Sequence, residues 1–353
     1  MELKETRSHK RTRAASPAAQ RAFQLVEALQ QTFADALTPI SQQRGDGKGF
    51  APVEWLRDEG RNGGGIRFVA ADQQLFNRAS VNVSQIHYDN LPNKALGSAS
   101  ALSCIIHPNN PYAPSMHMHI SWTQMKNGAG YWRMMADLNP AIEHPPATAA
   151  FSCSLRSAAP KQYAEANKQG ERYFHIPALS RHRGVSHFYL ENFSTDDPQA
   201  DFELANTIGK AVIQAYCTLL NDALIANPNP DTGSYQQQLA YHTLYLFQVL
   251  TLDRGTTSGL LVHNQNDVGI LGSLPSHIDR DLLASWKPKL DAPQDQLLGA
   301  ILNALPAASP CPVNDNTKQA IAECVRTHYR TFPDALAMQA SGATIPPTVD
   351  NHR

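Results

Sequence analysis

The feature that most constrains the fold of this chain lies between positions 62 and 138. Polar and apolar side chains alternate there in several short runs. In Ser115–Thr123, His117 and His119 alternate with apolar residues, so both rings project from one face of a strand. Runs with the same β character occupy residues 62–72, 79–89, 101–107 and 130–138. Because no helical pattern separates these runs, we predict that they pair antiparallel in one large sheet.

Helical patterns precede and follow these strands. Residues 21–41 place apolar side chains at intervals of three and four, which is typical of an amphipathic helix. Further helices are predicted at 201–225, 294–305 and 316–329, and further strands at 184–192, 246–252 and 259–262. The fold predicted from this order is α+β, with a large antiparallel sheet flanked by helices on both faces.

The chain is predicted to form a single domain over residues 21–332, because no linker interrupts that range. With 353 residues and 42% hydrophobic composition, it can bury a substantial core. Residues 1–20 are basic and lack an apolar stretch, which is typical of a disordered tail and not of a secretory signal. Residues 333–353 are expected to form a loose tail, and no run approaches the roughly eighteen apolar residues of a membrane span.

The overall charge is close to neutral, with 30 Lys and Arg against 31 Asp and Glu and a pI near 6.9. A chain with this charge balance does not bind nucleic acid or an anionic membrane through its total charge. The five cysteines are odd in number and form no C-x-x-C pair, which argues against a disulfide framework. Reduced thiols are typical of a cytoplasmic protein, and we expect that localisation.

Polar side chains within otherwise apolar strands are the best candidates for a functional site. Asn82 and Ser84 project from one such run, and Arg183 directly precedes another. Asp137 follows an apolar run, and burial raises the pKa of a carboxyl and makes it a usable base. We therefore expect Asp137→Asn to leave folding intact and to lower turnover at least about a hundredfold.

The H-x-H spacing of His117 and His119 leaves two interpretations open. With Asp137 or His87 as a further ligand, the histidines would form a metal site. Alternatively, both rings form a pocket wall and contact a ligand, while the apolar residues between them face the core. We favour the pocket wall and expect no metal. The chain contains neither G-x-x-x-x-G-K-[ST] nor G-x-S-x-G, so the corresponding phosphate loop and serine nucleophile are not indicated.

At the level of motifs, the sequence resembles the oxygen-dependent coproporphyrinogen III oxidases. The resemblance runs from about Trp55 to Pro275. It rests on GGGI at 63–66, VNVSQIH at 81–87, IIHPNNPYAPSMH at 105–117, ADLNP at 136–140, YFHIP at 173–177, RG at 183–184, LDRGTTSGL at 252–260 and SLP at 273–275. The shared order and the compatible spacings make the set far more specific than any one motif.

The resemblance implies a homodimer, a sheet between layers of helices, and a tetrapyrrole bound in a cleft above the sheet. Members of the family use molecular oxygen to convert propionates of coproporphyrinogen III to vinyl groups, and they are generally described as needing no metal or organic cofactor. It further implies that the carboxylate of Asp137 holds the pyrrole N–H, that His117 is catalytic and that Arg183 faces substrate carboxylates. We also expect Asn82, Ser84, His107, His119, Ser121, Arg133 and Arg254 to contact the substrate.

Several departures from the family pattern remove positive charge. In the family strand H-x-N-Y-R-Y-F, His119 stands in place of the asparagine and Ser121 in place of the arginine. Each bond between an arginine and a carboxylate contributes roughly 1.5–3 kcal/mol. We therefore expect a tetracarboxylate to bind poorly, unless Arg133, Arg181 or Arg67 replaces some of the missing arginines from another position.

Three functions remain open from the sequence. The first is an oxygen-dependent oxidase of a porphyrinogen or a related electron-rich heteroaromatic, with coproporphyrinogen as the default substrate. The second is a metal-dependent oxidase that uses His117 and His119, and the third is a non-catalytic tetrapyrrole-binding protein. We favour the first, because a pure carrier has no use for a buried base, and we expect a small-molecule substrate and no nucleic-acid partner.

Overall fold

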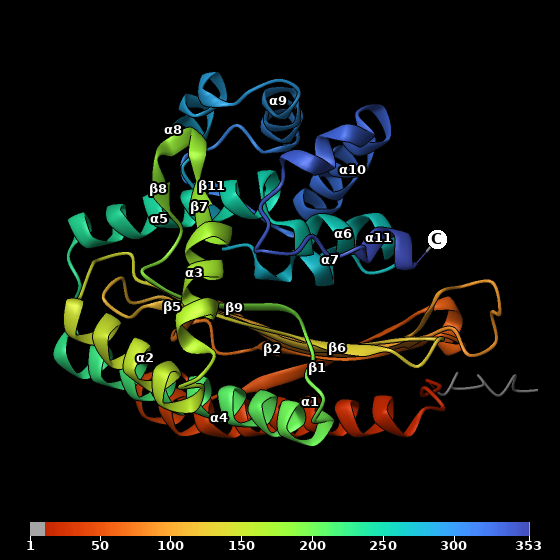
Figure 1. Cartoon of the computed structure of the whole chain (residues 1–353). Helices are drawn as coiled ribbons and strands as arrows, with labels where there is room; N and C mark the ends of the chain where they lie inside the picture. The colour runs from red at the N-terminus through yellow and green to blue at the C-terminus, as the bar shows by residue number, and fades with distance from the viewer. Residues whose placement is uncertain (1–10, 353) are drawn as a thin grey trace, which may run out of the picture.

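The structure, a computed structural model that describes residues 11–352, is built on a seven-stranded sheet in the order β1-β2-β3-β4-β5-β6-β9 (Figure 1). Every pairing in this sheet is antiparallel. The strands are β1 (Phe50–Leu56), β2 (Gly63–Ala70), β3 (Phe76–His87), β4 (Leu96–Pro108), β5 (Ser115–Met125), β6 (Gly130–Asn139) and β9 (Ser186–Phe193). The predicted antiparallel sheet is confirmed. The edge strand β1 was not predicted, because it contains Pro52 and most of its side chains are exposed, so it lacks alternation.

The lower face of the sheet packs on three long helices, α1 (Pro17–Arg44), α2 (Pro145–Ala158) and α4 (Pro198–Ala226), which lie below it in Figure 1. The predicted helices at 21–41 and 201–225 are therefore confirmed. Ser16 caps the start of α1, since its side chain accepts a hydrogen bond from the Ala19 N–H, and Pro17 occupies the first helical position. The apolar faces of α1 and α4 meet alternate strand residues, including Met118 and Ile120, in the main core.

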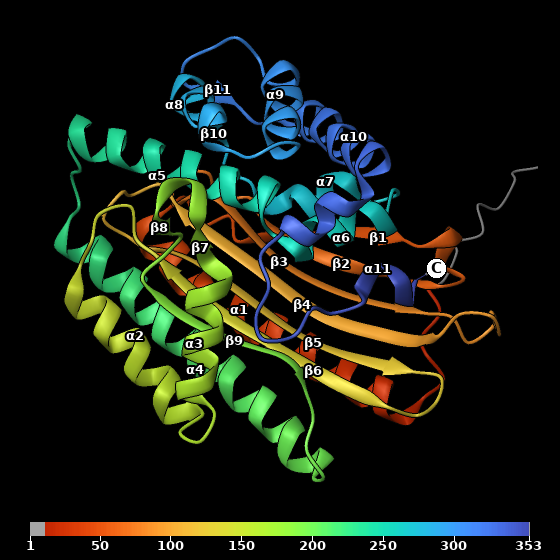
Figure 2. The same ribbon diagram turned by 45° about the horizontal axis from the view of Figure 1, so that its top comes forward.

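The upper face is covered by α3 (Tyr163–Phe174), α5 (Thr232–Thr251), α6 (Arg254–Val262), α7 (Asp267–Ile270) and α11 (Thr348–Asn351) (Figures 1 and 2). Above them lie α8 (Arg280–Ser285), α9 (Gln294–Ala304) and α10 (Asp315–Thr331), which share a second apolar core with α5. Two short ladders, β7 (His175–Ile176) with β8 (Arg181–His182) and β10 (His277–Ile278) with β11 (Cys311–Pro312), join the segments. Helices thus lie on both faces, as predicted. Within residues 11–352, none of the helices combines the length and the apolar character needed to cross a membrane.

The predicted strands at 246–252 and 259–262 are wrong, because these residues belong mainly to α5 and α6. The two helices meet at Asp253, whose side chain caps α6 by accepting a hydrogen bond from the Thr256 N–H at 2.6 Å. All residues from Tyr241 to Thr251 are buried, so this half of α5 has no polar face. Without a polar face, a helix loses the 3.6-residue period that distinguishes it from a buried strand.

The predicted disordered tail covers residues 1–20, of which residues 1–10 lie outside the described residues. Residues 11–20 differ from that prediction, because they are held by hydrogen bonds or belong to α1. The Thr12 N–H donates to the Gly60 carbonyl at 2.9 Å, and the Ala14 N–H donates to Gln85 Oε1 at 2.9 Å. Residues 12–14 therefore pack against the sheet before α1 begins. Hydrogen bonds to distant residues cannot be recognised in a short polar stretch.

The C-terminal segment also differs from the loose tail predicted for residues 333–353. The Ala340 N–H donates to the Leu252 carbonyl at 2.9 Å, and Lys94 Nζ donates to the His352 carbonyl at 2.7 Å. Figure 2 shows this segment crossing above the upper face of the sheet and ending at α11. The last described residues therefore lie over the middle strands.

Alternation along β5 separates two chemically different faces. Met118 and Ile120 are fully buried in the lower core, whereas His117 and His119 face the upper layer and line a cavity there. The prediction that both rings share one face and form a pocket wall is confirmed in its geometry. Polar side chains of the neighbouring strands follow the same alternation.

Gly170 allows α3 to lie directly on β9. A Cβ at this position would come within 2.6 Å of the His187 Cβ and 3.1 Å of the Phe188 nitrogen. Alanine gains about 1 kcal/mol in helix propensity, but overpacking costs typically about 1–3 kcal/mol and here involves backbone that cannot rotate away. We expect Gly170→Ala to lower the free energy of unfolding by about 1–2 kcal/mol in urea denaturation. The exposed Lys168→Ala is the control, with a change below about 0.5 kcal/mol. A Gly170→Ala protein about 1 kcal/mol more stable than wild type would show that α3 moves away without cost.

Candidate active site

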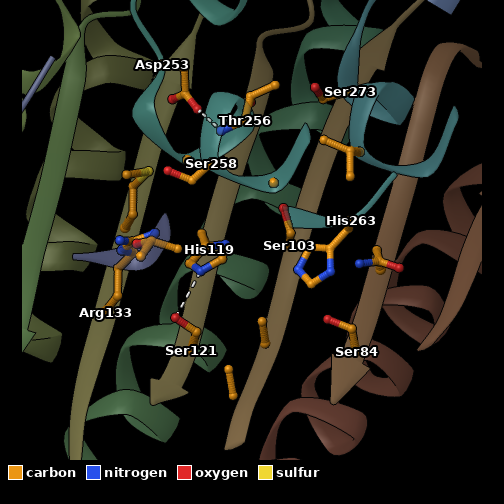
Figure 3. Close-up of a pocket in the computed structure, with 18 of the residues that line it drawn as sticks. Ser84, Ser103, His119, Ser121, Arg133, Asp253, Thr256, Ser258, His263 and Ser273 are labelled. Atoms are coloured by element: carbon orange, nitrogen blue, oxygen red, sulfur yellow. Dashed lines mark hydrogen bonds between the residues drawn. The ribbon is translucent and has the colours of Figure 1, made fainter. Parts of the chain in front are cut away.

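A cavity of about 280 Å³ lies between the upper face of the sheet and the helices above it. Small polar side chains of the central strands form its floor, and Figure 3 shows Ser84, Ser103 and Ser121 on three of these strands. The roof includes Asp253, Thr256 and Ser258 of the α6 region and the nearby His263 (Figure 3). Of the predicted contacts, Asn82, Ser84, His117, His119, Ser121, Arg133 and Arg183 all line this cavity. Small floor residues leave space for a ligand above the sheet.

Asp137 connects the residues at one end of the cavity. Its Oδ1 accepts a hydrogen bond from His117 Nδ1 at 2.8 Å, and its Oδ2 accepts one from Arg183 Nη2 at 2.8 Å. The Asn139 amide donates to Oδ2 as well, at 2.6 Å. His117 lies opposite Asp137 in the β5–β6 register, and both His117 and Arg183 line the cavity. Asp137 itself is fully buried behind them and contributes no cavity surface.

The expected rise in the pKa of Asp137 is wrong. Burial alone would raise the pKa of this carboxyl, but the charges of Arg183 and His117 outweigh burial, and hydrogen bonds from His117 and Asn139 add to their effect. Together they hold the pKa of Asp137 well below its ordinary value. Asp137 is therefore a fixed negative charge at neutral pH, and its geometry suits it to position His117 and Arg183.

The carboxylate of Asp137 also determines how His117 is oriented. An ionised carboxylate only accepts hydrogen bonds, so the hydrogen-bond network assigns the N–H to Nδ1 of His117. In the neutral ring, Nε2 is then the acceptor, and none of the residues 11–352 forms a hydrogen bond with it. This arrangement of carboxylate and imidazole is the one by which enzymes orient a general base.

His119 contributes a neutral hydrogen-bonding group to the cavity wall. Its Nε2 lies 3.0 Å from Ser121 Oγ, a contact drawn as a dashed line in Figure 3. Burial lowers the pKa of His119 well below its ordinary value, and the nearby charges of Arg133 and His117 lower it further. His119 therefore carries no charge at neutral pH.

Arg133 is paired with Glu191, a residue that the sequence analysis missed. Arg133 Nε donates to Glu191 Oε2 at 2.5 Å, and the Tyr189 hydroxyl donates to the same oxygen. The Glu191 side chain is fully buried, while Arg133 and Glu191 both line the cavity. The signal was available, because Glu191 directly follows the apolar run Phe188–Leu190 in strand β9, the same feature that selected Asp137.

Two residues expected to contact the substrate lie outside the cavity. His107 is fully buried, with Nδ1 2.8 Å from Ser115 Oγ and Nε2 3.1 Å from the Ser273 carbonyl. Arg254 donates to the Leu336 carbonyl at 2.8 Å and so holds the C-terminal segment. Both side chains stabilise the fold around the site, and a motif match cannot distinguish that role from ligand contact.

The C-terminal segment supplies cavity residues for which the sequence carried no signal. Thr348, Asn351 and His352 line the cavity, and the Tyr88 hydroxyl lies 2.8 Å from His352 Nδ1. This stretch has neither an apolar period nor a recognisable motif. Only its packing across the sheet brings it to the site.

The metal site considered for His117 and His119 lacks further ligands in the part of the chain that the structure describes. No three side chains of His, Cys, Asp or Glu come together there in a way that could hold a metal ion. His117 Nδ1 is engaged by Asp137, and His87, considered as a further ligand, has its Nε2 2.9 Å from Thr12 Oγ1. His117 and His119 by themselves supply two ligands, fewer than protein metal sites usually have.

The fold and the cavity on an antiparallel sheet agree with the family suggested by the motifs. The family model of coproporphyrinogen III oxidase matches residues 21–305, and the chain belongs to this family. It is 27% identical over 282 residues to the mitochondrial oxygen-dependent coproporphyrinogen-III oxidase of Rattus norvegicus, which covers 72% of this chain and 61% of that protein. The chain thus spans about three fifths of the length of this relative.

Two further relatives match a larger part of their own length. The oxygen-dependent coproporphyrinogen-III oxidase of Drosophila melanogaster is 27% identical over 308 residues, covering 79% of this chain and 75% of that protein. The enzyme of the same name from Rickettsia bellii (strain OSU 85-389) is 25% identical over 258 residues, covering 68% of this chain and 90% of that protein.

Because Asp137 neutralises the buried Arg183, we revise the expectation that Asp137→Asn leaves folding intact. Removing one partner leaves a charge buried and unpaired, which typically costs about 3–5 kcal/mol. We expect a loss of this size in the free energy of unfolding at pH 7, measured by urea denaturation. The exposed acid Glu203→Gln is the control, with a change below about 0.5 kcal/mol.

The pH dependence provides a second readout of this pair. A carboxyl whose folded-state pKa lies below its ordinary value of 3.8 contributes stability that is complete above that value and is lost as the pH falls through the folded-state pKa. The part of the stability difference between wild type and Asp137→Asn that comes from the carboxylate should therefore shrink as the pH falls below about 4. A difference that does not shrink in acid would contradict an ionised Asp137.

Proposed function

We propose that this protein is an oxygen-dependent oxidase that converts propionate side chains of a porphyrinogen to vinyl groups. Each step consumes one propionate carboxylate, O2 and a proton, and releases CO2 and H2O2 as the side chain loses a β-hydrogen and becomes a vinyl group. Membership of the coproporphyrinogen III oxidase family supports the reaction class. The observation that carries the proposal is the placement of His117 in the cavity, held from behind by Asp137.

In this proposal, Nε2 of His117 accepts the hydrogen of a pyrrole N–H. The electron-rich pyrrole becomes more easily oxidised as this hydrogen is withdrawn, and oxygen is the oxidant. Asp137 stabilises the positive charge that develops on the imidazole, because its carboxylate lies 2.8 Å from Nδ1. Asp137 thus acts through His117 and not as the group that touches the pyrrole, which changes the role that the family resemblance implied.

The surrounding residues would orient the macrocycle. Asn82 leaves its Oδ1 without a hydrogen bond among the described residues, and the floor serines are small enough for a flat ring to approach the sheet. The roof of α6 and the C-terminal segment would restrict access of bulk water to the reacting carbon. We propose that molecular oxygen is the co-substrate and that neither a metal nor an organic cofactor is required.

The assembly and location are proposals as well. We propose a homodimer in the cytoplasm, as the resemblance and the reduced cysteines suggest, although relatives with mitochondrial names leave the compartment open. Light scattering of the purified protein at micromolar concentration should give about twice the mass of one 38.7 kDa chain. A single-chain mass over the whole concentration range would refute the dimer.

The reaction is tested with coproporphyrinogen III under air, in buffer that contains a strong metal chelator and no added cofactor. We expect vinyl-bearing product with release of CO2, no product without oxygen, and a loss of at least about a hundredfold in turnover for His117→Gln. His277→Gln is the control, because His277 is exposed on the short strand β10, and it should keep wild-type turnover.

The other outcomes identify the alternative functions. Turnover that the chelator abolishes and added metal restores would favour the metal-dependent oxidase. Tight porphyrin binding without any turnover would favour the tetrapyrrole-binding protein. Wild-type turnover in His117→Gln would remove His117 from the mechanism.

A further inference from the structure

His187 lies beside the candidate active site but outside the motifs that the chain shares with its family. It is directly opposite Asp137 in the β6–β9 register, so both side chains project from the upper face of the sheet. The His187 side chain is only 1% exposed. It does not line the cavity, so any influence of this buried ring on the reaction has to pass through a neighbouring residue.

Both ring nitrogens of His187 face hydrogen-bond acceptors. Nδ1 lies 2.8 Å from Glu171 Oε1 on α3, and Nε2 lies 2.7 Å from the carbonyl oxygen of Arg183. A carboxylate and a carbonyl can only accept, so each bond needs a hydrogen on the ring nitrogen. A neutral imidazole carries one such hydrogen and an imidazolium carries two. Only the protonated ring can therefore make both bonds at once.

The charges around His187 favour the protonated ring. The hydrogen bond from His187 lowers the pKa of Glu171; burial opposes this effect, and the charges of His187 and His182 lower the pKa further. The His182 ring, 5.7 Å away between centroids, is neutral at physiological pH, because burial lowers its pKa. The other charged groups on the neighbouring elements, Asp137 and Arg183, neutralise each other at 2.8 Å. Glu171 is therefore the negative partner of His187.

The bond to the Arg183 carbonyl holds the backbone that carries an active-site guanidinium group. Arg183 lies between the short strand β8 and strand β9 and belongs to neither ladder. Its N–H donates to the Phe174 carbonyl at 3.0 Å, and its own carbonyl accepts from His187. These two bonds fix the Arg183 backbone where sheet pairing does not.

The Arg183 side chain carries this backbone position into the cavity wall. Its guanidinium group lies over the rings of Phe174 and Tyr245, at 4.4 and 4.9 Å from their centroids. It also donates to Asp137 Oδ2 at 2.8 Å. The His187 ring stacks on Phe174, at 5.0 Å between centroids and 25° between planes. His187 thus supports Arg183 both through its carbonyl and through the Phe174 ring.

We propose that His187 is a positioning residue for the active site, and that it acts in its protonated form by bridging Glu171 and the Arg183 carbonyl. Loss of the ring proton breaks one of the two bonds. Arg183 then shifts, which weakens the salt bridge that holds Asp137 behind His117. The inference rests on the proposed function and adds to it a loss of turnover as the pH rises through the deprotonation of His187.

The neutral ring keeps the bond to Glu171 and gives up the bond to Arg183. A hydrogen bond to a carboxylate is roughly twice as strong as one to a neutral carbonyl, so the remaining hydrogen stays on Nδ1. The lone pair of Nε2 then faces the Arg183 carbonyl oxygen, and two acceptors at the observed 2.7 Å repel each other. Deprotonation therefore displaces the Arg183 backbone and does not merely leave it unsupported.

Histidine NMR on the full-length protein labelled with 15N tests the bridge without requiring turnover. The ring signals of His187 are assigned by their loss in His187→Gln and in His187→Asn. Both ring nitrogens should carry hydrogen until the ring titrates, and Glu171→Gln should lower the pH of that transition by about one unit, because it removes the negative partner. The His117 signals should change at the same pH in each protein, since Arg183 and Asp137 connect the two rings.

The pH profile of turnover on coproporphyrinogen III tests the effect on the reaction. Wild-type turnover should fall on the alkaline side at the pH at which His187 loses its proton. Glu171→Gln should move this fall to lower pH by the same amount, about one unit, whereas a purely structural residue would lower turnover equally at every pH. Glu165→Gln is the matched control, because this exposed acid of the same helix contacts only its neighbour Gln169 among the described side chains, and it should keep the wild-type profile.

The outcomes distinguish this inference from the proposed function. An alkaline fall that stays in place in a folded Glu171→Gln protein, while His187 loses its proton at lower pH, would overturn the positioning role. A His187 ring that is neutral at every pH at which the protein is folded would overturn the bridge. Failure of wild type to convert the porphyrinogen would refute the proposed function; His117 signals that follow the titration of His187 would still support the coupling, and signals that ignore it would overturn the coupling as well.

Discussion

Every functional feature described above depends on the strict alternation of side chains along the central antiparallel strands. Because successive residues point to opposite sides, Met118 and Ile120 can be buried under the sheet while His117 and His119 line a cavity above it. The helices α1 and α4 hold the apolar side in place. A shift of one residue in the register would exchange the two faces, so the core and the cavity are specified together.

Buried charge is the second constraint, and the chain handles it in two ways. Asp137 and Glu191 are fully buried, and each is stabilised by an arginine and further hydrogen bonds. Such pairs are expensive to desolvate and stabilise the fold only while they remain complete. Arg67 is a different case: burial lowers its pKa, and the charge of Asp315 opposes this effect.

Local patterns predicted the sheet well because each central strand has one buried and one polar face. The resulting alternation of side chains can be recognised within a few consecutive residues. The same rule failed for α5, where burial on all sides removed the period, and for β1, where exposure on the edge did so. It also failed for the terminal segments, whose positions depend on hydrogen bonds to residues far away in the chain, such as Ala14 to Gln85 and Lys94 to His352.

The sequence by itself determined the α+β class, the shared face of His117 and His119, and the motif pattern that places the chain in its family, because these follow from spacing between near neighbours. It did not determine the ionisation of Asp137, whose pKa depends on Arg183 arriving from another segment. Nor did it reveal that His107 and Arg254 lie outside the cavity, or that Glu191 neutralises Arg133. Charge balance and burial arise from contacts between distant segments, and only the tertiary structure brings those contacts about.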